Sequence, residues 1–395
     1  RFCAGSRLHD GAAPPRCAAV FARSLRRLAP VSIFIQMFAF GVGAFFVLSG
    51  YLLARPFWKA LDAGETMPSL ATYALRRAAR ILPGFWLALT VSFLLSFLVL
   101  GSALDGALIL RFVAGFFMVA DFHWLTWFPT DFNPPLWSIG AEATSYALLP
   151  LCLWLVFALP FARGWAARLL WVAVLGIIVA AQFAILAYLE PDPIRRGWQY
   201  GLLGGAKFWW PNYNPVSFFA MFAVGALAAG IQVRVAALRS IWFDAVALAG
   251  LAVAIGALAV NYPVSDAYGL AGIPYGFPWF PIGVGMILLA TPSAVILPRL
   301  TEVRPIAYVA QVSFGIYVWH YLLMEIVRVL WEADYVYWGM RDVGAWAWIS
   351  LVIVVLSFVI ATLSYRFIEE PVIRWARGLE KRPGNAAPTL SPAAG

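Results

Sequence analysis

Charged residues are scarce in this chain of 395 residues. Only 12% are Asp, Glu, Lys or Arg, whereas 63% are hydrophobic and the mean hydropathy is +0.82. Soluble domains carry about 25% charged residues, which keep their surfaces in water. The composition therefore excludes an ordinary soluble domain and predicts a membrane protein.

Cysteine is also rare. The three cysteines, Cys3, Cys17 and Cys152, form no even set, no paired spacing and no metal-ligand pattern. This excludes a disulfide framework and predicts that the protein holds no metal. We expect the three to act as small apolar side chains.

The net charge of +9 does not indicate nucleic-acid binding. Its meaning depends on where the cations lie, and most of them fall in short turns between apolar runs. That placement is typical of membrane topology. We therefore expect the lipid bilayer, and no nucleic acid, as a partner.

Nine apolar runs are long enough to cross a bilayer, which takes about 20 helical residues. They are residues 32–54, 81–100, 136–162, 168–188, 213–233, 241–260, 276–297, 306–331 and 345–369. A tenth run, residues 107–120, is too short to cross easily, and we expect it to be interfacial or re-entrant. The sequence predicts an all-α integral membrane protein with about nine or ten transmembrane helices in a single bundle.

The turns alternate in charge along the chain. Those on one side hold Arg55, Lys59, Arg76, Arg77, Arg80, Arg163, Arg234, Arg239, Arg299, Arg304, Arg374, Arg377, Lys381 and Arg382. The opposite turns hold only Arg111, Arg195, Arg196, Lys207 and Arg341. Because cytoplasmic loops are enriched in Lys and Arg, we expect the first side, with the C-terminus, to face the cytoplasm. Residues 374–395 show no helical or strand periodicity, so we expect them to form a disordered tail.

Five segments carry polar residues into these apolar runs: residues 45–53, 76–83, 136–142, 313–320 and 364–371. Together, in this order, they resemble the acyltransferase 3 family over about residues 41 to 371. The resemblance implies a multi-pass enzyme of the plasma (inner) membrane. It implies transfer of an acyl group, commonly acetyl from acyl-CoA (acetyl-CoA), to a hydroxyl of a glycan, a cell-envelope polymer or a glycosylated metabolite.

Arg77 and Arg80 are the predicted donor-binding residues. They are three positions apart, so they share a face if a helix extends back to them. Guanidinium groups suit the phosphates of a nucleotide-like donor, and Arg77-Ala78-Ala79-Arg80 matches a family motif. The alternative is that both side chains anchor a helix by reaching to the lipid headgroups. The motif leads us to favour acyl-CoA binding.

Glu142 is the first predicted catalytic residue, in a segment that matches the family pattern Trp-Ser-x-x-x-Glu. It lies four residues before Tyr146, on the same helical face, and an ionisable group at membrane depth is expensive and usually functional. We expect Glu142 to orient, or to accept a proton from, the catalytic centre. The alternative is a simple ion pair with an intramembrane cation.

His320 is the second predicted catalytic residue. A histidine can act as general base near neutral pH, and acyl transfer to a neutral alcohol needs one. The alternative is a hydrogen-bonded packing residue among aromatics. Two other motif features are interpreted as structural: Ser49 as a small residue for close helix packing, and Arg366 with Glu370 as an i,i+4 pair.

Residues 1–30 depart from the family. The family begins with a membrane helix that carries an arginine and, ten residues later, a histidine, whereas this segment has neither an apolar span nor that pair. A divergent terminus and a reading-frame error are both open explanations. Residues 31–373 are then the predicted acyltransferase 3-like domain. A transporter or acyl-group translocator and a catalytically impaired relative are the competing functional classes.

Overall fold

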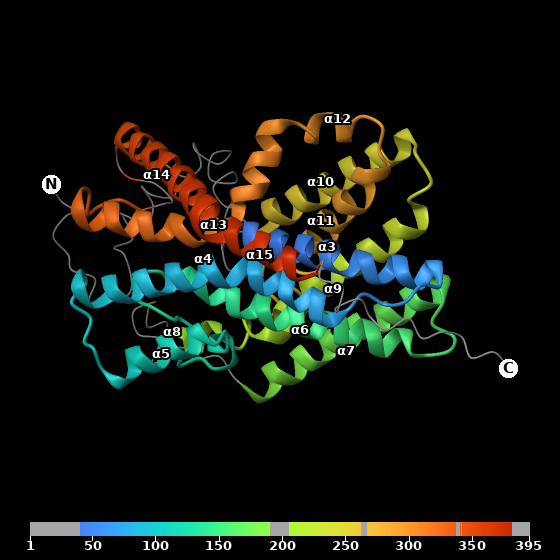
Figure 1. Ribbon diagram of the computed structural model, residues 1–395, viewed down its shortest axis with the longest axis horizontal. Coiled ribbons are helices and arrows are strands. Elements are labelled where there is room, and N and C mark those ends of the chain that lie inside the picture. Colours follow the sequence, from blue (N-terminus) through green and yellow to red (C-terminus); the bar gives the residue numbers. More distant parts are fainter. Residues whose placement is uncertain (1–39, 190–204, 262–266, 337–339, 341, 381–395) are drawn as a thin grey trace.

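The structure is a computed structural model that describes residues 40–189, 205–261, 267–336, 340 and 342–380 (Figure 1). Within these residues every regular element is a helix. The α-helices are α3 (Gly41–Ala63), α4 (Leu70–Leu98), α5 (Gly106–Phe116), α6 (Trp137–Phe157), α7 (Gly164–Tyr188), α8 (Gly205–Trp209), α9 (Pro215–Val235), α10 (Ile241–Asn261), α11 (Trp279–Ala290), α12 (Leu297–Thr301), α13 (Arg304–Leu330), α14 (Val343–Ser364) and α15 (Glu370–Glu380). The short 3₁₀ segments are η1 (Ala120–Phe122), η2 (Pro134–Leu136), η4 (Leu270–Gly272) and η5 (Thr291–Ser293). A π-helical turn, η6 (Tyr365–Glu369), joins α14 to α15.

The prediction of an all-α membrane protein is confirmed. Seven described helices are long and apolar enough to cross a membrane, the last of them running through α14, η6 and α15. The two remaining predicted spans correspond to α3, which carries Arg55, Lys59 and Asp62, and to α11, which has only 12 residues. The short run near 107–120 forms α5, which has 11 residues.

The bundle has two distinct ends. At the one we call the basic end, α3 stops, α4 and α13 begin, and α15 packs against α4. At the one we call the aromatic end, the segments 117–136, 209–214 and 267–278 pack on one another. In Figure 1 the α13–α14 pair lies at the upper left and the α10–α11 pair at the upper right, with α4 and α6 passing below them.

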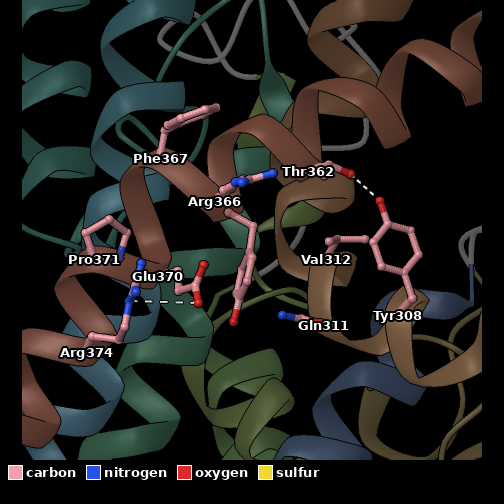
Figure 2. A pocket seen from close by; sticks show the side chains of 10 residues that line it. Tyr308, Gln311, Val312, Thr362, Arg366, Phe367, Glu370, Pro371 and Arg374 are labelled. Carbon is pink, nitrogen blue, oxygen red and sulfur yellow. Dashed lines mark hydrogen bonds and ion pairs between the residues drawn. The ribbon is translucent and has the colours of Figure 1, made fainter. Parts of the chain in front are cut away.

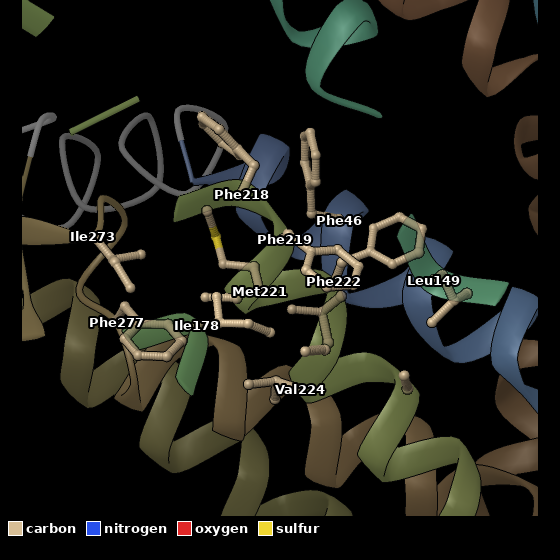
Figure 3. Close-up of a cluster of buried hydrophobic side chains, with 14 of the residues drawn as sticks. Phe46, Leu149, Ile178, Phe218, Phe219, Met221, Phe222, Val224, Ile273 and Phe277 are labelled. Atoms are coloured by element: carbon tan, nitrogen blue, oxygen red, sulfur yellow. The ribbon is translucent and has the colours of Figure 1, made fainter. Parts of the chain in front are cut away.

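Helix α9 forms the centre and packs most extensively on α3. The two backbones touch: a Cβ atom at Gly50 would lie 2.0 Å from the Phe222 carbonyl oxygen, and one at Gly225 would lie 1.9 Å from that of Val47. Small residues permit such close approach of membrane helices. Figure 3 shows the cluster of buried hydrophobic side chains beside this crossing, in which the ring centroids of Phe46 and Phe218 are 4.7 Å apart.

Helix α7 forms part of the outer surface. It is one of the most apolar helices, yet Leu169 is 70% exposed and Ile177 and Phe183 are exposed as well. An apolar face that no other helix covers is expected where the surrounding solvent is lipid. The surface therefore agrees with the composition.

A buried ion pair joins three helices at the basic end. Arg168 on α7 donates to both carboxylate oxygens of Asp62 on α3, at 2.8 and 2.7 Å, and to the Gly230 carbonyl on α9. Its guanidinium also lies 4.5 Å from the ring centroid of Trp58. Every charge in this pair has a partner, as burial in a low-dielectric interior requires.

Two sequence predictions about the basic end are wrong. The turn expected between the apolar runs 32–54 and 81–100 is much shorter, because α3 continues to Ala63 and α4 begins at Leu70, where Ser69 caps its first turn. The predicted disordered tail is helical in its first part: α15 continues to Glu380, since Ala376 is buried and the helix packs against α4. Residues 1–30 and 381–395 lie outside the described residues.

Candidate active site

Glu142 lies on α6, one and a half turns from the start of the helix. Pro134 and Pro135 in η2 fix the direction in which the chain enters this helix. The Glu142 side chain is only 2% exposed, and one carboxylate oxygen accepts hydrogen bonds from the Tyr146 hydroxyl and from Ser49 Oγ, the latter at 3.1 Å. Among the described residues no ion pair involves Glu142. The alternative of a simple intramembrane ion pair is therefore not what the structure shows.

Ser49 is a contact that the sequence did not reveal. Its motif favoured a packing role, and its neighbour Gly50 does serve close packing, but the Ser49 hydroxyl binds the Glu142 carboxylate across 93 positions of sequence. The only local signal was a hydroxyl in an otherwise apolar run. In such a run a buried hydroxyl needs a polar partner.

Helix α4 joins this network through Tyr73, whose hydroxyl donates to the Tyr146 carbonyl oxygen at 3.1 Å. Beside it, a groove of about 330 Å³ runs between α4 and α6. Tyr73, Arg77 and Tyr146 line it together with apolar residues that include Met118 and Ile81. The groove thus brings one predicted donor-binding arginine next to the tyrosine that binds Glu142.

Arg80 faces another side of α4 from that groove. Its guanidinium donates to the Gln311 carbonyl oxygen on α13 at 2.9 Å and lies 3.9 Å from a carboxylate oxygen of Glu369 in η6. It also lies 5.7 Å from the ring centroid of Tyr365 and is 28% exposed. The charges of both Arg77 and Arg80 act on Glu142. Helix α4 does extend back to both arginines, but only Arg77 lines the groove while Arg80 contacts α13 and η6, so the expected common face is not observed.

His320 lies on α13 and is half-buried. Its Nδ1 bonds to the carbonyl oxygens of Tyr317 at 2.7 Å and Ile316 at 3.2 Å. Because a carbonyl oxygen only accepts, Nδ1 carries the proton, which leaves Nε2 of a neutral ring as the acceptor. In the described part of the chain no hydrogen bond joins His320 to Glu142, so the two predicted catalytic residues are not in contact.

Helix α13 is nevertheless tied to the start of α6. The Tyr317 hydroxyl binds Ser138 Oγ and donates to the Pro135 carbonyl oxygen at 3.0 Å. Asn133 donates to the Val318 carbonyl oxygen at 2.9 Å. These bonds hold the His320 segment and the Glu142 helix in one arrangement, and sequence spacing could not reveal them because they join residues about 180 positions apart.

Asp121 is a buried acid at the aromatic end that the sequence did not single out. One carboxylate oxygen accepts from Thr144 on α6 at 3.2 Å, while the other has no hydrogen-bond partner among the described residues. Burial raises the pKa of the Asp121 carboxyl to about 7, against the lowering effect of its hydrogen bonds. The unpartnered oxygen lies against Gly140, where a Cβ atom would be 2.8 Å away.

Comparison with known proteins decides the family. A family model described as an acyltransferase domain, Acyl_transf_3, matches residues 19–366. The chain belongs to the acyltransferase 3 family. The match begins before the first described residue and extends well upstream of the motifs that carry the resemblance.

The chain is similar to two named acyltransferases. It is 27% identical over 351 residues to the peptidoglycan O-acetyltransferase OatA of Listeria monocytogenes serovar 1/2a, a match that covers 84% of this chain and 51% of that protein. It is 22% identical over 346 residues to the acyltransferase MdmB of Streptomyces mycarofaciens, covering 84% of this chain and 80% of that one. The chain thus spans about half the length of the Listeria protein. No solved structure matches it.

Proposed function

We propose that this membrane acyltransferase transfers an acyl group, acetyl in the first instance, from acyl-CoA to a hydroxyl of a glycan, a cell-envelope polymer or a glycosylated small molecule. The names of the two relatives support the reaction class. The observation that carries the proposal is Glu142, a buried acid bonded to Tyr146, which lines the same groove as Arg77.

Acyl transfer to a hydroxyl needs a group that accepts the hydroxyl proton. The acceptor oxygen attacks the thioester carbonyl, a C–O bond forms and the C–S bond breaks, and the hydroxyl proton must leave because a neutral alcohol is a weak nucleophile. In our proposal Tyr146 takes that proton as it passes its own to Glu142. The proton then returns to the departing thiolate, which leaves as coenzyme A thiol.

Three further residues have assigned roles in the proposal. Arg77 and Arg80 attract the phosphates of the donor, because guanidinium groups form charge-assisted bonds with phosphate. His320 is the second candidate base, since its Nδ1 is held by backbone carbonyls and Nε2 is free to accept a proton. Replacing His320 by Gln separates this role from that of Glu142.

The basic end faces the cytoplasm of a plasma (inner) membrane in this proposal, and the C-terminus lies on the same side. The bias of Lys and Arg toward the turns at this end supports the orientation. It also places Arg77 and Arg80 where a cytoplasmic acyl-CoA arrives.

The first thirty residues enter the proposal as a separate question. If the arginine and histidine of the family's first helix are essential, the chain as written transfers slowly or not at all. A version that carries an apolar first helix with that pair should then be active. Sequencing the coding DNA upstream of Val31 decides whether such a helix is encoded.

The test is release of coenzyme A thiol by reconstituted protein given acetyl-CoA and hydroxylated acceptors. Both versions of the N-terminus are assayed, each with Glu142→Gln and with Glu302→Gln, an exposed acid on the basic end, as matched control. We expect Glu142→Gln to slow the active version by about 10²–10⁴-fold and the control to leave it unchanged. A translocator would consume no acyl-CoA in any version.

A further inference from the structure

A second pocket lies between α13 and the α14–α15 segment. It holds about 670 Å³, within the range of roughly 300–1,000 Å³ that small-molecule sites occupy. Figure 2 shows Tyr308 and Thr362 on one side of it and Glu370 and Arg374 on the other. The hydroxyls of Tyr308 and Thr362 bind each other, which fixes that wall.

Two arginines line this pocket. Arg366 comes from the π-helical turn and Arg374 from α15. The sequence predicts that Arg366 pairs with Glu370, but the structure instead places Arg374 3.8 Å from the Glu370 carboxylate. The i,i+4 prediction is wrong because the turn over residues 365–369 is π-helical, which changes the angular spacing of the side chains.

Within the described residues Arg366 takes part in no ion pair and is exposed in the pocket. A guanidinium that no carboxylate neutralises is available to an anionic ligand. Glu370 is the one carboxylate in the lining, and it competes for Arg374. The pocket therefore carries two cations against one anion.

The pocket adjoins the candidate active site through Arg80. The guanidinium of Arg80 binds the Gln311 carbonyl and lies over the Tyr365 ring, and both of these residues line the pocket. On the same helix, Arg77 lines the mostly apolar groove that leads to Tyr146. Arg80 thus contacts residues of the polar, cationic pocket, and Arg77, one turn before it, lines the apolar groove.

We propose that the pocket between α13 and α15 binds phosphate groups through Arg366 and Arg374, and that they belong to the nucleotide portion of the acyl-CoA donor. This identification rests on the proposed function. The less polar acyl and pantetheine arm then runs from the phosphates past Arg80 and Arg77 into the apolar groove that leads to Tyr146. An anionic phospholipid headgroup presents the same phosphate chemistry, so the test must separate the two sources.

The first arm measures coenzyme A binding by calorimetry to the full chain in nanodiscs of phosphatidylcholine, which carries no net charge. We expect Arg366→Gln and Arg374→Gln each to weaken binding about tenfold, as loss of one charge-assisted contact implies. Glu370→Gln should tighten it several-fold because it frees Arg374. Arg299→Gln, at an exposed position on the basic end, is the control and should change nothing.

The second arm adds phosphatidylglycerol to the nanodiscs and follows the thermal unfolding midpoint. Suppose that phosphatidylglycerol raises the unfolding midpoint only when Arg366 and Arg374 are present, while coenzyme A binds equally well without them. The pocket would then still be a phosphate site, but its assignment to the donor would be overturned. If neither ligand depends on the two arginines and Glu370→Gln tightens nothing, the site itself is refuted.

Neither arm requires turnover. Arginine-dependent coenzyme A binding, with no thiol release from either version of the N-terminus, would therefore sustain this site and refute the proposed function. Thiol release, together with coenzyme A binding that does not depend on the two arginines, would support the proposed function and refute the assignment of this pocket to the donor. The gain expected from Glu370→Gln keeps the test decisive even if an arginine variant fails to fold.

Discussion

The α3–α9 crossing and the junction of α4, α13 and α15 are built in opposite ways. At the crossing, backbones touch at Gly50 and Gly225 and aromatic rings fill the remaining space. At the junction, the helices meet through side chains, among them Arg80 and Phe314, and two open volumes lie nearby. The comparison indicates that the crossing is a rigid scaffold and the junction a place for ligands.

The difference has a physical basis. Close-packed contacts between small residues lose energy steeply when either helix moves, because any shift creates overlap or a void. Contacts made by a long, partly exposed guanidinium tolerate movement, since the side chain can follow the backbone. Binding sites need some such freedom.

The largest expected effect comes from Gly225→Ala at the crossing. The new Cβ atom would lie 1.9 Å from the Val47 carbonyl oxygen, so the helices must separate. We expect little or no folded, monodisperse protein in size-exclusion chromatography. Gly176→Ala on the exposed face of α7, where nothing lies within 4 Å, is the matched control and should behave as wild type.

Arg168→Gln should have the next largest effect, because it leaves Asp62 charged and partly buried without its partner. Breaking a buried pair by removing one member costs about 3–5 kcal/mol. Equilibrium unfolding in mixed micelles measures the loss. Arg374→Gln removes an exposed pair and should cost less than about 1 kcal/mol; equal costs for the two variants would contradict the description of this end.

The aromatic end should respond to pH through Asp121. Its pKa is raised to about 7 in the folded state, so the folded protein holds this proton more tightly than the unfolded chain does. The protonated carboxyl therefore adds to the free energy of unfolding at low pH, and this contribution is lost as pH rises from about 4 to about 7. The slope is at most about 1.4 kcal/mol per pH unit.

In Asp121→Asn we expect the thermal unfolding midpoint to depend less on pH across that range. His123→Gln, which replaces the exposed histidine nearby, serves as the control. A wild-type slope that survives in Asp121→Asn would show that the Asp121 carboxyl is not its source.

Gly84→Ala makes the same chemical change as Gly225→Ala, but at the junction, and should have the smallest effect. Its Cβ atom would lie 3.1 Å from the Phe314 ring and 3.2 Å from the Glu369 carboxylate, both side-chain atoms that can move. We expect a change in unfolding free energy below about 1 kcal/mol. A loss as large as that of Gly225→Ala would remove the distinction between the two regions.

The sequence predicted the helices better than their ends. Apolar runs are a local signal, so most spans were found from composition alone. Helix ends depend on tertiary contacts, and the starts and stops of α3, α4 and α15 were therefore missed. Helix α15 is stabilised by packing on α4, which its polar composition does not reveal.

The candidate site was predicted one residue at a time. Glu142 was found because an acid in an apolar run is conspicuous. Its contacts with Ser49 and, through Tyr146, with Tyr73 join three helices. Contacts between residues so far apart in the chain cannot be inferred from a single sequence. Asp121 was passed over because it follows a short run in a polar segment, where an acid is ordinary.

The central claim is that the hydroxyl-bound carboxylate of Glu142 supports acyl transfer. The most direct measurement is single-turnover transfer of isotopically labelled acetyl from acetyl-CoA to a hydroxylated acceptor, in the N-terminal version that releases thiol. We predict that Glu142→Gln slows the transfer step by about 10²–10⁴-fold while coenzyme A affinity stays within about twofold. Labelled acceptor appearing at the wild-type rate in Glu142→Gln would contradict the account.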